Sequence, residues 1–162
     1  MADGGGALPP VLSVRGLSVS FTGSGRDVPA VRGIDFDVHQ GEVLGIVGES
    51  GSGKSVTALA VTGLLPPTAR VAGSIRVGAV EVTTADAETL RALRARDVGL
   101  IFQDPTTTLN PVLTIGRQVI EGQVAHGLVP AGEAGARAAE LLREVDIPDP
   151  AVRAGQYPHQ FS

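Results

Sequence analysis

The stretch that decides how this 162-residue chain folds reads Gly48-Glu49-Ser50-Gly51-Ser52-Gly53-Lys54-Ser55. It follows an apolar run at residues 43–47 and precedes a second, helix-like apolar run at residues 56–65. A Gly-x-x-x-x-Gly-Lys-Ser pattern between a strand and a helix is typical of a loop that cradles phosphate groups. The alternative, a glycine-rich turn that binds no ligand, does not explain the Lys-Ser pair or its two flanks.

The residue types in this stretch suit a triphosphate. Glycines permit positive φ angles and leave the backbone N–H groups unobstructed, so several of these donors can converge on one anion. We expect Lys54 to contact the β- and γ-phosphates, Ser55 to offer its hydroxyl to Mg²⁺, and the side chain of Glu49 to point away. The following helix directs its positive end at the anion. The predicted ligand-binding residues are Gly48, Glu49, Ser50, Gly51, Ser52, Gly53, Lys54, Ser55 and Val56.

Composition excludes several other classes of function. The net charge is −4 and the sequence contains no cysteine, so nucleic acid is not expected as a partner, and neither disulfides nor thiolate metal sites can form. The apolar run at residues 56–65 is too short to cross a bilayer and is expected to stop at Pro66-Pro67. Residues 1–10 do not resemble a signal peptide and are predicted to be a disordered lead-in.

Hydrophobic periodicity predicts an α/β protein. Expected strands span residues 11–21, 30–38, 42–47, 73–82 (broken at Gly78) and 98–102. Expected helices span residues 56–65, 114–126 and 133–145, and a further short helix is expected to run through Arg94 with either Thr84 or Asp86 as its cap. The first three strands, joined by short turns, predict a small antiparallel sheet that leads into the phosphate loop. The helix at 56–65 is apolar all round and is expected to be buried, whereas Arg91, Arg94 and Arg96 are expected on a solvated face.

Three motifs together resemble the ATP-binding subunit of ABC transporters, in particular the oligopeptide/dipeptide import family. They are VGESGSGKSVT at residues 47–57, IFQDPTTTLNP at residues 101–111 and YPHQFS at residues 157–162. The first alone would indicate only a P-loop protein. The second resembles the Q-loop of that family with its characteristic continuation, and the third resembles the approach to its signature sequence. The resemblance extends from about residue 11 to the last residue.

The resemblance implies a P-loop ATPase core with an N-terminal antiparallel β subdomain. Residues 11–162 would form the N-terminal part of a nucleotide-binding domain, with the Q-loop and the start of the helical subdomain at about 103–162. The implied cofactors are ATP and Mg²⁺. Gln103 would contact Mg²⁺ and the attacking water, and Phe21 would stack on adenine. From the residues alone, Phe21 could equally be a core aromatic residue at a strand end, and Gln103 a polar residue that ends a strand.

The resemblance also implies partners. The loop from Asp104 to Leu113 would contact transmembrane subunits, a second ATPase subunit would complete a dimer, and the protein would be cytoplasmic, on the inner face of the cell membrane. The family pattern continues beyond Ser162 into the rest of the signature, a Walker B strand and a switch histidine. We therefore expect a truncated, incomplete core that binds ATP weakly and does not hydrolyse it. The alternative function is a non-catalytic chain that docks on a membrane subunit or on a full-length partner.

Overall fold

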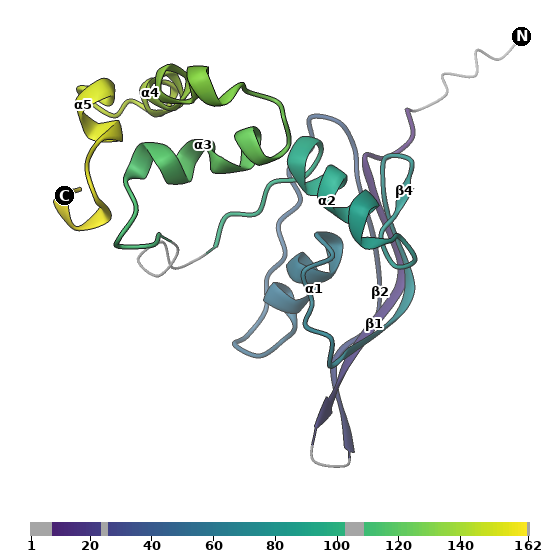
Figure 1. Ribbon diagram of the computed structural model, residues 1–162. Coiled ribbons are helices and arrows are strands. Elements are labelled where there is room, and N and C mark those ends of the chain that lie inside the picture. The colour runs from purple at the N-terminus through teal and green to yellow at the C-terminus, as the bar shows by residue number, and fades with distance from the viewer. Residues whose placement is uncertain (1–7, 24–25, 103–108, 162) are drawn as a thin grey trace, which may run out of the picture. The chain divides into compact units, whose positions relative to one another are not determined.

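The computed structural model describes residues 8–23, 26–102 and 109–161 (Figure 1). The chain divides into two compact units, Met1–Leu100 and Ile101–Ser162. Of the predicted disordered lead-in at residues 1–10, only residues 8–10 are described, and they form no helix or strand.

The first unit is built on a four-stranded antiparallel sheet. Its strands are β1 (Leu12–Gly23), β2 (Arg26–Val38), β3 (Ala69–Val77) and β4 (Val80–Glu81), in the order β2-β1-β3-β4. β1 pairs with both β2 and β3, so it occupies a central position. The predicted antiparallel sheet at the N-terminus is confirmed, but β3 and β4 join β1 and β2 in place of the expected strand at residues 42–47.

A bulge in β1 explains the spacing of its buried residues. Val14 and Leu17 are both fully buried although they are three positions apart, because the register shifts between them. Gly16 lies in this bulge with φ of 56°, a conformation that glycine adopts without steric cost, and its N–H donates to Asp35 Oδ1 at 2.8 Å. The extra residue keeps the apolar side chains of β1 on one face of the sheet.

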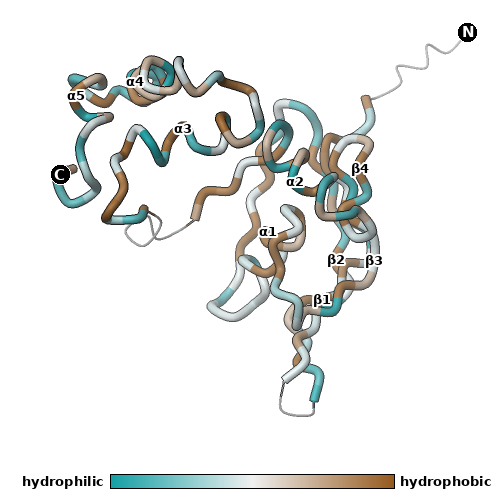
Figure 2. Tube along the Cα trace, viewed as in Figure 1, coloured by the Kyte–Doolittle hydropathy of each residue, from teal (hydrophilic) through white to brown (hydrophobic). Residues whose placement is uncertain are grey.

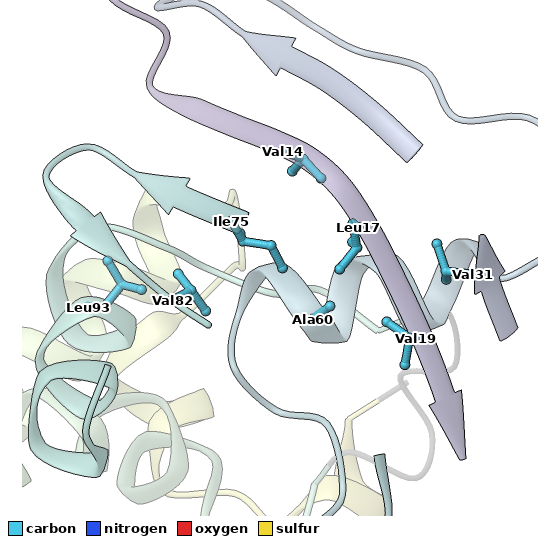
Figure 3. Packing of buried hydrophobic residues seen from close by; sticks show 8 residues of the cluster. All are labelled: Val14, Leu17, Val19, Val31, Ala60, Ile75, Val82 and Leu93. Carbon is cyan, nitrogen blue, oxygen red and sulfur yellow. The ribbon is translucent and has the colours of Figure 1, made fainter. Parts of the chain in front are cut away.

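The core of this unit lies between the sheet and two helices, α1 (Lys54–Val61) and α2 (Ala87–Arg96) (Figure 3). The buried cluster consists of Val14, Leu17, Val19, Val31, Ala60, Ile75, Val82 and Leu93. Burying a Val, Leu or Ile side chain contributes about 1.5–3 kcal/mol, so this cluster is the main source of stability for the unit. Of the two caps expected for α2, Thr84 and Asp86, the structure uses Asp86, whose carboxylate accepts from the N–H of Thr89 at 2.8 Å.

A Schellman motif at Gly63 ends α1, earlier than the sequence predicted. Gly63 has φ of 63°, its N–H donates to Ala60 O, and the N–H of Leu64 donates to Leu59 O. The helix therefore stops before the two prolines. Its expected burial on all sides is also wrong, because Ala58 is exposed on the face away from the sheet.

Two predicted strands are absent from the described residues. The segments at 42–47 and 98–102 are assigned to no strand and pair with no described neighbour. Both are mostly brown in Figure 2, and Val43, Val47 and Ile101 are about 95% exposed. A strand needs a partner for its N–H and C=O groups, and the described sheet uses only β1 to β4. Apolar composition alone therefore did not suffice to make these segments strands.

Glu81 fastens the hairpin between β3 and β4. Its carboxylate accepts from the Ser74 hydroxyl at 2.7 Å, from the Ile75 N–H at 2.9 Å and from the Thr83 hydroxyl. Partial burial acts to raise the pKa of Glu81, but these hydrogen bonds outweigh it and the pKa lies below its ordinary value. The ionised carboxylate is thus the form that stabilises the hairpin.

The second unit is helical. It contains α3 (Ile115–Ala125), η1 (Ala131–Glu133), α4 (Ala134–Glu144), α5 (Pro150–Ala154) and η2 (Pro158–Gln160). α3 packs against α4 and α5, and its buried face includes Ile115 and Ile120. The two helices predicted at 114–126 and 133–145 are confirmed as α3 and α4. Val145, expected on the apolar stripe of the latter, lies beyond the helix end and is exposed.

Candidate functional site

The predicted phosphate loop lies directly before α1, and its shape depends on two left-handed glycines. Gly51 and Gly53 have φ of 80° and 93°, values that residues with a side chain rarely adopt. A Cβ at position 53 would lie 2.5 Å from the carbonyl oxygen of Ala30 in β2. The loop is therefore pressed against the backbone of β2, and only glycine permits this approach.

Lys54 occupies the inside of this loop. Its Nζ donates to the carbonyl oxygens of Gly48 and Glu49, each at 2.7 Å, and to Ser52 Oγ at 3.3 Å. The three acceptors hold the ammonium group against the loop, so a positive charge is already in place for an anion. The Glu49 side chain is exposed, while its backbone takes part in the cradle.

The first turn of α1 supplies further donors. Within the described part of the chain, the N–H groups of Gly53, Lys54, Ser55 and Val56 donate to no protein acceptor. Such free N–H groups, with the positive end of the helix dipole, favour a bound anion. Ser55 is exposed, whereas Val56 packs against the core cluster and anchors the turn.

At the opposite end of α1, a backbone carbonyl group accepts a hydrogen bond from an arginine that was expected on a solvated face. Arg94 of α2 donates from Nη1 to the carbonyl oxygen of Thr62 at 3.1 Å. A guanidinium group at this end complements the negative pole of the helix. The prediction that Arg91, Arg94 and Arg96 share a solvated face is therefore wrong for Arg94, since its contact is with a residue 32 positions away.

A hollow of about 450 Å³ opens beside the phosphate loop. Residues 51–54 of the loop and residues 29–32 of β2 lie on its walls, together with Thr57 of α1. This volume is within the range of small-molecule sites, about 300–1,000 Å³. The hollow therefore brings the predicted loop together with a strand that the sequence did not implicate.

The other predicted site residues are placed differently. Phe21 lies near the end of β1, opposite Val28 and Ala69, where it packs against the core cluster and does not line the hollow. Gln103 lies outside the described residues. So does the first half of the predicted contact loop from Asp104 to Leu113; in its second half, Val112 is 74% exposed.

Two negative findings concern only the described residues. No cluster of three or more His, Asp or Glu side chains is arranged to hold a metal ion. No helix has the length and apolar character that crossing a membrane requires.

Two of the curated relatives that match this chain are named as ATP-binding proteins of dipeptide transport or peptide import. The dipeptide transport ATP-binding protein DppD of Bacillus subtilis is 47% identical over 154 residues, which cover 94% of this chain and 46% of the relative. A putative peptide import ATP-binding protein of Brucella abortus is 46% identical over 154 residues, with the same coverage. The chain thus spans about half the length of the curated relatives it matches.

Two of the solved structures that match are ATP-binding cassettes. A dimeric bacterial ABC transporter cassette aligns with a TM-score of 0.77 and 24% identity, over 93% of this chain and 63% of that chain. A second structure, the dimeric post-hydrolysis state of an ATP-binding cassette bound to ADP and Pi, aligns with the same values. The likeness confirms the predicted fold class, an α/β P-loop core, here incomplete, with an antiparallel β subdomain and the start of a helical subdomain.

A family model agrees with these alignments. The model described as ABC transporter matches residues 31–162, which include the phosphate loop, α1 and the whole second unit. This chain therefore belongs to the ABC transporter family.

Proposed function

We propose that the chain binds ATP through the loop at residues 48–55, as the nucleotide-binding part of a peptide import ATPase. The observation that carries this proposal is the Lys54 ammonium, held inside a glycine loop by three acceptors and next to free N–H groups at the start of α1. The relatives' names, which state dipeptide transport and peptide import, support the class of transported substrate.

The donor set fits a nucleotide with Mg²⁺. Backbone N–H groups and Lys54 would bind the phosphates, and the exposed Ser55 hydroxyl together with Gln103 would hold the ion. When bound, Mg²⁺ neutralises phosphate charge. Phe21 would contact adenine only if its ring turns away from the cluster on which it now packs. The hydrophobic wall of residues 29–31 in β2 is a second candidate surface for the base or ribose.

The partners we propose follow from the same family membership. Transmembrane subunits would dock on the loop from Asp104 to Leu113, and a second ATPase subunit would complete a dimer, as in the dimeric cassettes that this chain resembles. The chain would then be cytoplasmic and attached to the inner face of the membrane through these subunits. In the whole protein, ATP hydrolysis would drive peptide transport. The 162 residues by themselves would bind ATP weakly and hydrolyse it negligibly.

The experiment that tests ATP binding compares Lys54→Ala with a charge-matched control. Arg91 is exposed and makes no side-chain hydrogen bond among the described residues, so Arg91→Ala removes one positive charge without touching the loop. A hydrogen bond to a charged group contributes about 1.5–3 kcal/mol, so Lys54→Ala is expected to weaken Mg-ATP binding at least about tenfold. Arg91→Ala should bind like the unaltered chain. Equal affinity of Lys54→Ala and the unaltered chain, measured by calorimetry, would contradict the proposal.

The exposure of Val112 favours one second candidate, a non-catalytic chain that docks on a membrane subunit or on a full-length partner. Docking of this kind would not depend on nucleotide. Co-purification of a membrane subunit with the same yield for Lys54→Ala and for the unaltered chain, with and without ATP, would favour this second function.

A further inference from the structure

Gln118 of α3 binds the backbone of the segment that precedes the helix. Its Oε1 accepts from the N–H of Asn110 at 2.7 Å, and its Nε2 donates to the carbonyl oxygens of Asn110 and Leu113, both at 2.9 Å. The paired bonds to Asn110 satisfy one backbone donor and one backbone acceptor, as a neighbouring β-strand would. The Gln118 side chain therefore makes the two backbone hydrogen bonds that a neighbouring strand would otherwise make.

The segment that Gln118 holds is itself a closed turn. The Oδ1 of Asn110 accepts from the N–H of Val112 at 3.1 Å, and the carbonyl oxygen of Asn110 accepts from the N–H of Leu113 at 3.2 Å. Pro111 restricts the backbone between them. Leu109, Pro111 and Val112 are exposed beside the exposed Asn110, so the turn presents an uncharged and mostly apolar surface.

The base of α3 is fixed on its other side. The N–H of Ile115 donates to the carbonyl oxygen of Gln156 at 2.8 Å. A Cβ at position 116 would lie 2.8 Å from the carbonyl oxygen of Ala154, so Gly116 lets α3 lie in close contact with α5. Gln118 thus anchors the turn to a helix end that cannot easily shift.

We propose that Gln118 is a positioning residue, which holds residues 109–113 in a preformed shape for contact with an apolar surface of the membrane subunit. This inference rests on the docking part of the proposed function. A surface loop that is ordered before binding loses less conformational entropy when a partner docks, so its affinity is higher than that of a free loop. The amide of Gln118 contributes this order without contacting the partner itself.

The absence of cysteine from the sequence permits a direct test. Val112→Cys introduces a single thiol at the exposed tip of the turn, to carry either a spin label or a crosslinker. Gln118→Leu removes the amide with little change in helix propensity. Gln123→Leu is the matched control, because Gln123 lies in the same helix and its side chain makes no hydrogen bond among the described residues.

The first readout is the order of the turn in the full chain. In Gln118→Leu we expect the amide hydrogen of Asn110 to exchange at least about tenfold faster and the spin label at position 112 to become more mobile. The helix content from circular dichroism should not change. Gln118→Asn keeps the amide but shortens its reach by one methylene, so it should behave like the leucine variant. Unchanged exchange and mobility would overturn the inference.

The second readout is docking. The thiol at position 112 is crosslinked to inside-out membrane vesicles of the source organism, and the product is identified by mass spectrometry as a multi-span membrane subunit. We expect the yield to fall about tenfold or more in Gln118→Leu and to stay the same in Gln123→Leu. Equal yields in the two variants would overturn the inference.

ATP binding, measured on the same samples, separates this inference from the proposed function. A yield that depends on Gln118 supports the inference even if the chain binds no ATP, which would refute the nucleotide part of the proposed function. Intact ATP binding without any crosslink in the Val112→Cys chain that keeps Gln118 would overturn both the docking proposal and the role of Gln118.

Discussion

Gly53→Ala tests whether the phosphate loop is shaped by its close approach to β2. The added Cβ would lie 2.5 Å from the carbonyl oxygen of Ala30 and 3.1 Å from Cγ2 of Val31. Val31 is buried, and Ala30 belongs to the same strand, so neither atom can move without disturbing the sheet. The same substitution at Gly51 and Gly48 provides internal controls within one loop.

The three positions differ in what the added methyl group meets. At Gly53, a left-handed backbone costs about 1–2 kcal/mol for a residue with a side chain. The forced contact with β2 adds about 1–3 kcal/mol, which gives a loss of about 2–5 kcal/mol. At Gly51, with φ of 80°, no described atom lies within 4 Å of the Cβ position, so only the backbone strain of about 1–2 kcal/mol remains. At Gly48 the Cβ would meet Ser52 Oγ at 2.6 Å, a hydroxyl that can rotate at the cost of about 1 kcal/mol for its hydrogen bond.

Urea unfolding followed by circular dichroism measures these losses. Because the slope of stability against urea is about 1–3 kcal/mol per M, Gly53→Ala should unfold at a clearly lower midpoint than the other two variants. From most to least stable, the expected order is Gly48→Ala, Gly51→Ala and Gly53→Ala. A Gly53→Ala chain that is already unfolded without urea would also fit this order. ATP affinity should follow the same order. If Gly53→Ala proves as stable as Gly51→Ala, the approach of the loop to β2 does not require glycine and the reasoning is refuted.

Three further predictions concern the packing around the site. Asp86→Ala removes the cap of α2 and should lower the unfolding free energy by about 1 kcal/mol in urea melts. Gly122→Ala should stabilise α3 by about 0.5–1 kcal/mol, because this helical glycine has open space around it. Gly116→Ala should instead destabilise the second unit by about 1–3 kcal/mol, because its Cβ would contact Ala154. Thermal melts in which the two variants are equally stable would contradict this packing. Glu81→Gln should be less stable than the unaltered chain above pH 4.5, the ordinary pKa of a glutamate. The difference in unfolding free energy between the two chains should shrink as the pH falls through the lowered pKa of Glu81 in the folded protein, since protonation then removes the charged acceptor from the unaltered chain too.

Elements whose cause is local could be predicted from the sequence. The glycines and Lys54 at residues 48–55 indicated a phosphate loop because spacing over eight residues defines its chemistry. The start of α2 was narrowed to a cap at Thr84 or Asp86, since a cap is an interaction between residues three positions apart, and the structure uses Asp86. The periodicity of α3 and α4 likewise reports one helix face at a time.

Features that join distant segments were decided only by the tertiary structure. Residues 42–47 and 98–102 have the composition of strands, but a strand depends on a neighbour, and the described sheet is completed by β3 and β4. Arg94 stands in no motif, and it binds the backbone of Thr62, 32 positions away. Gln118 also stands in no motif, although the turn that it binds directly precedes its own helix. The sequence by itself therefore determined the glycine pattern of the loop at residues 48–55 and the presence of the four helices α1 to α4. The tertiary structure determined which backbone groups meet, because hydrogen bonds between distant segments leave no periodic trace in the sequence.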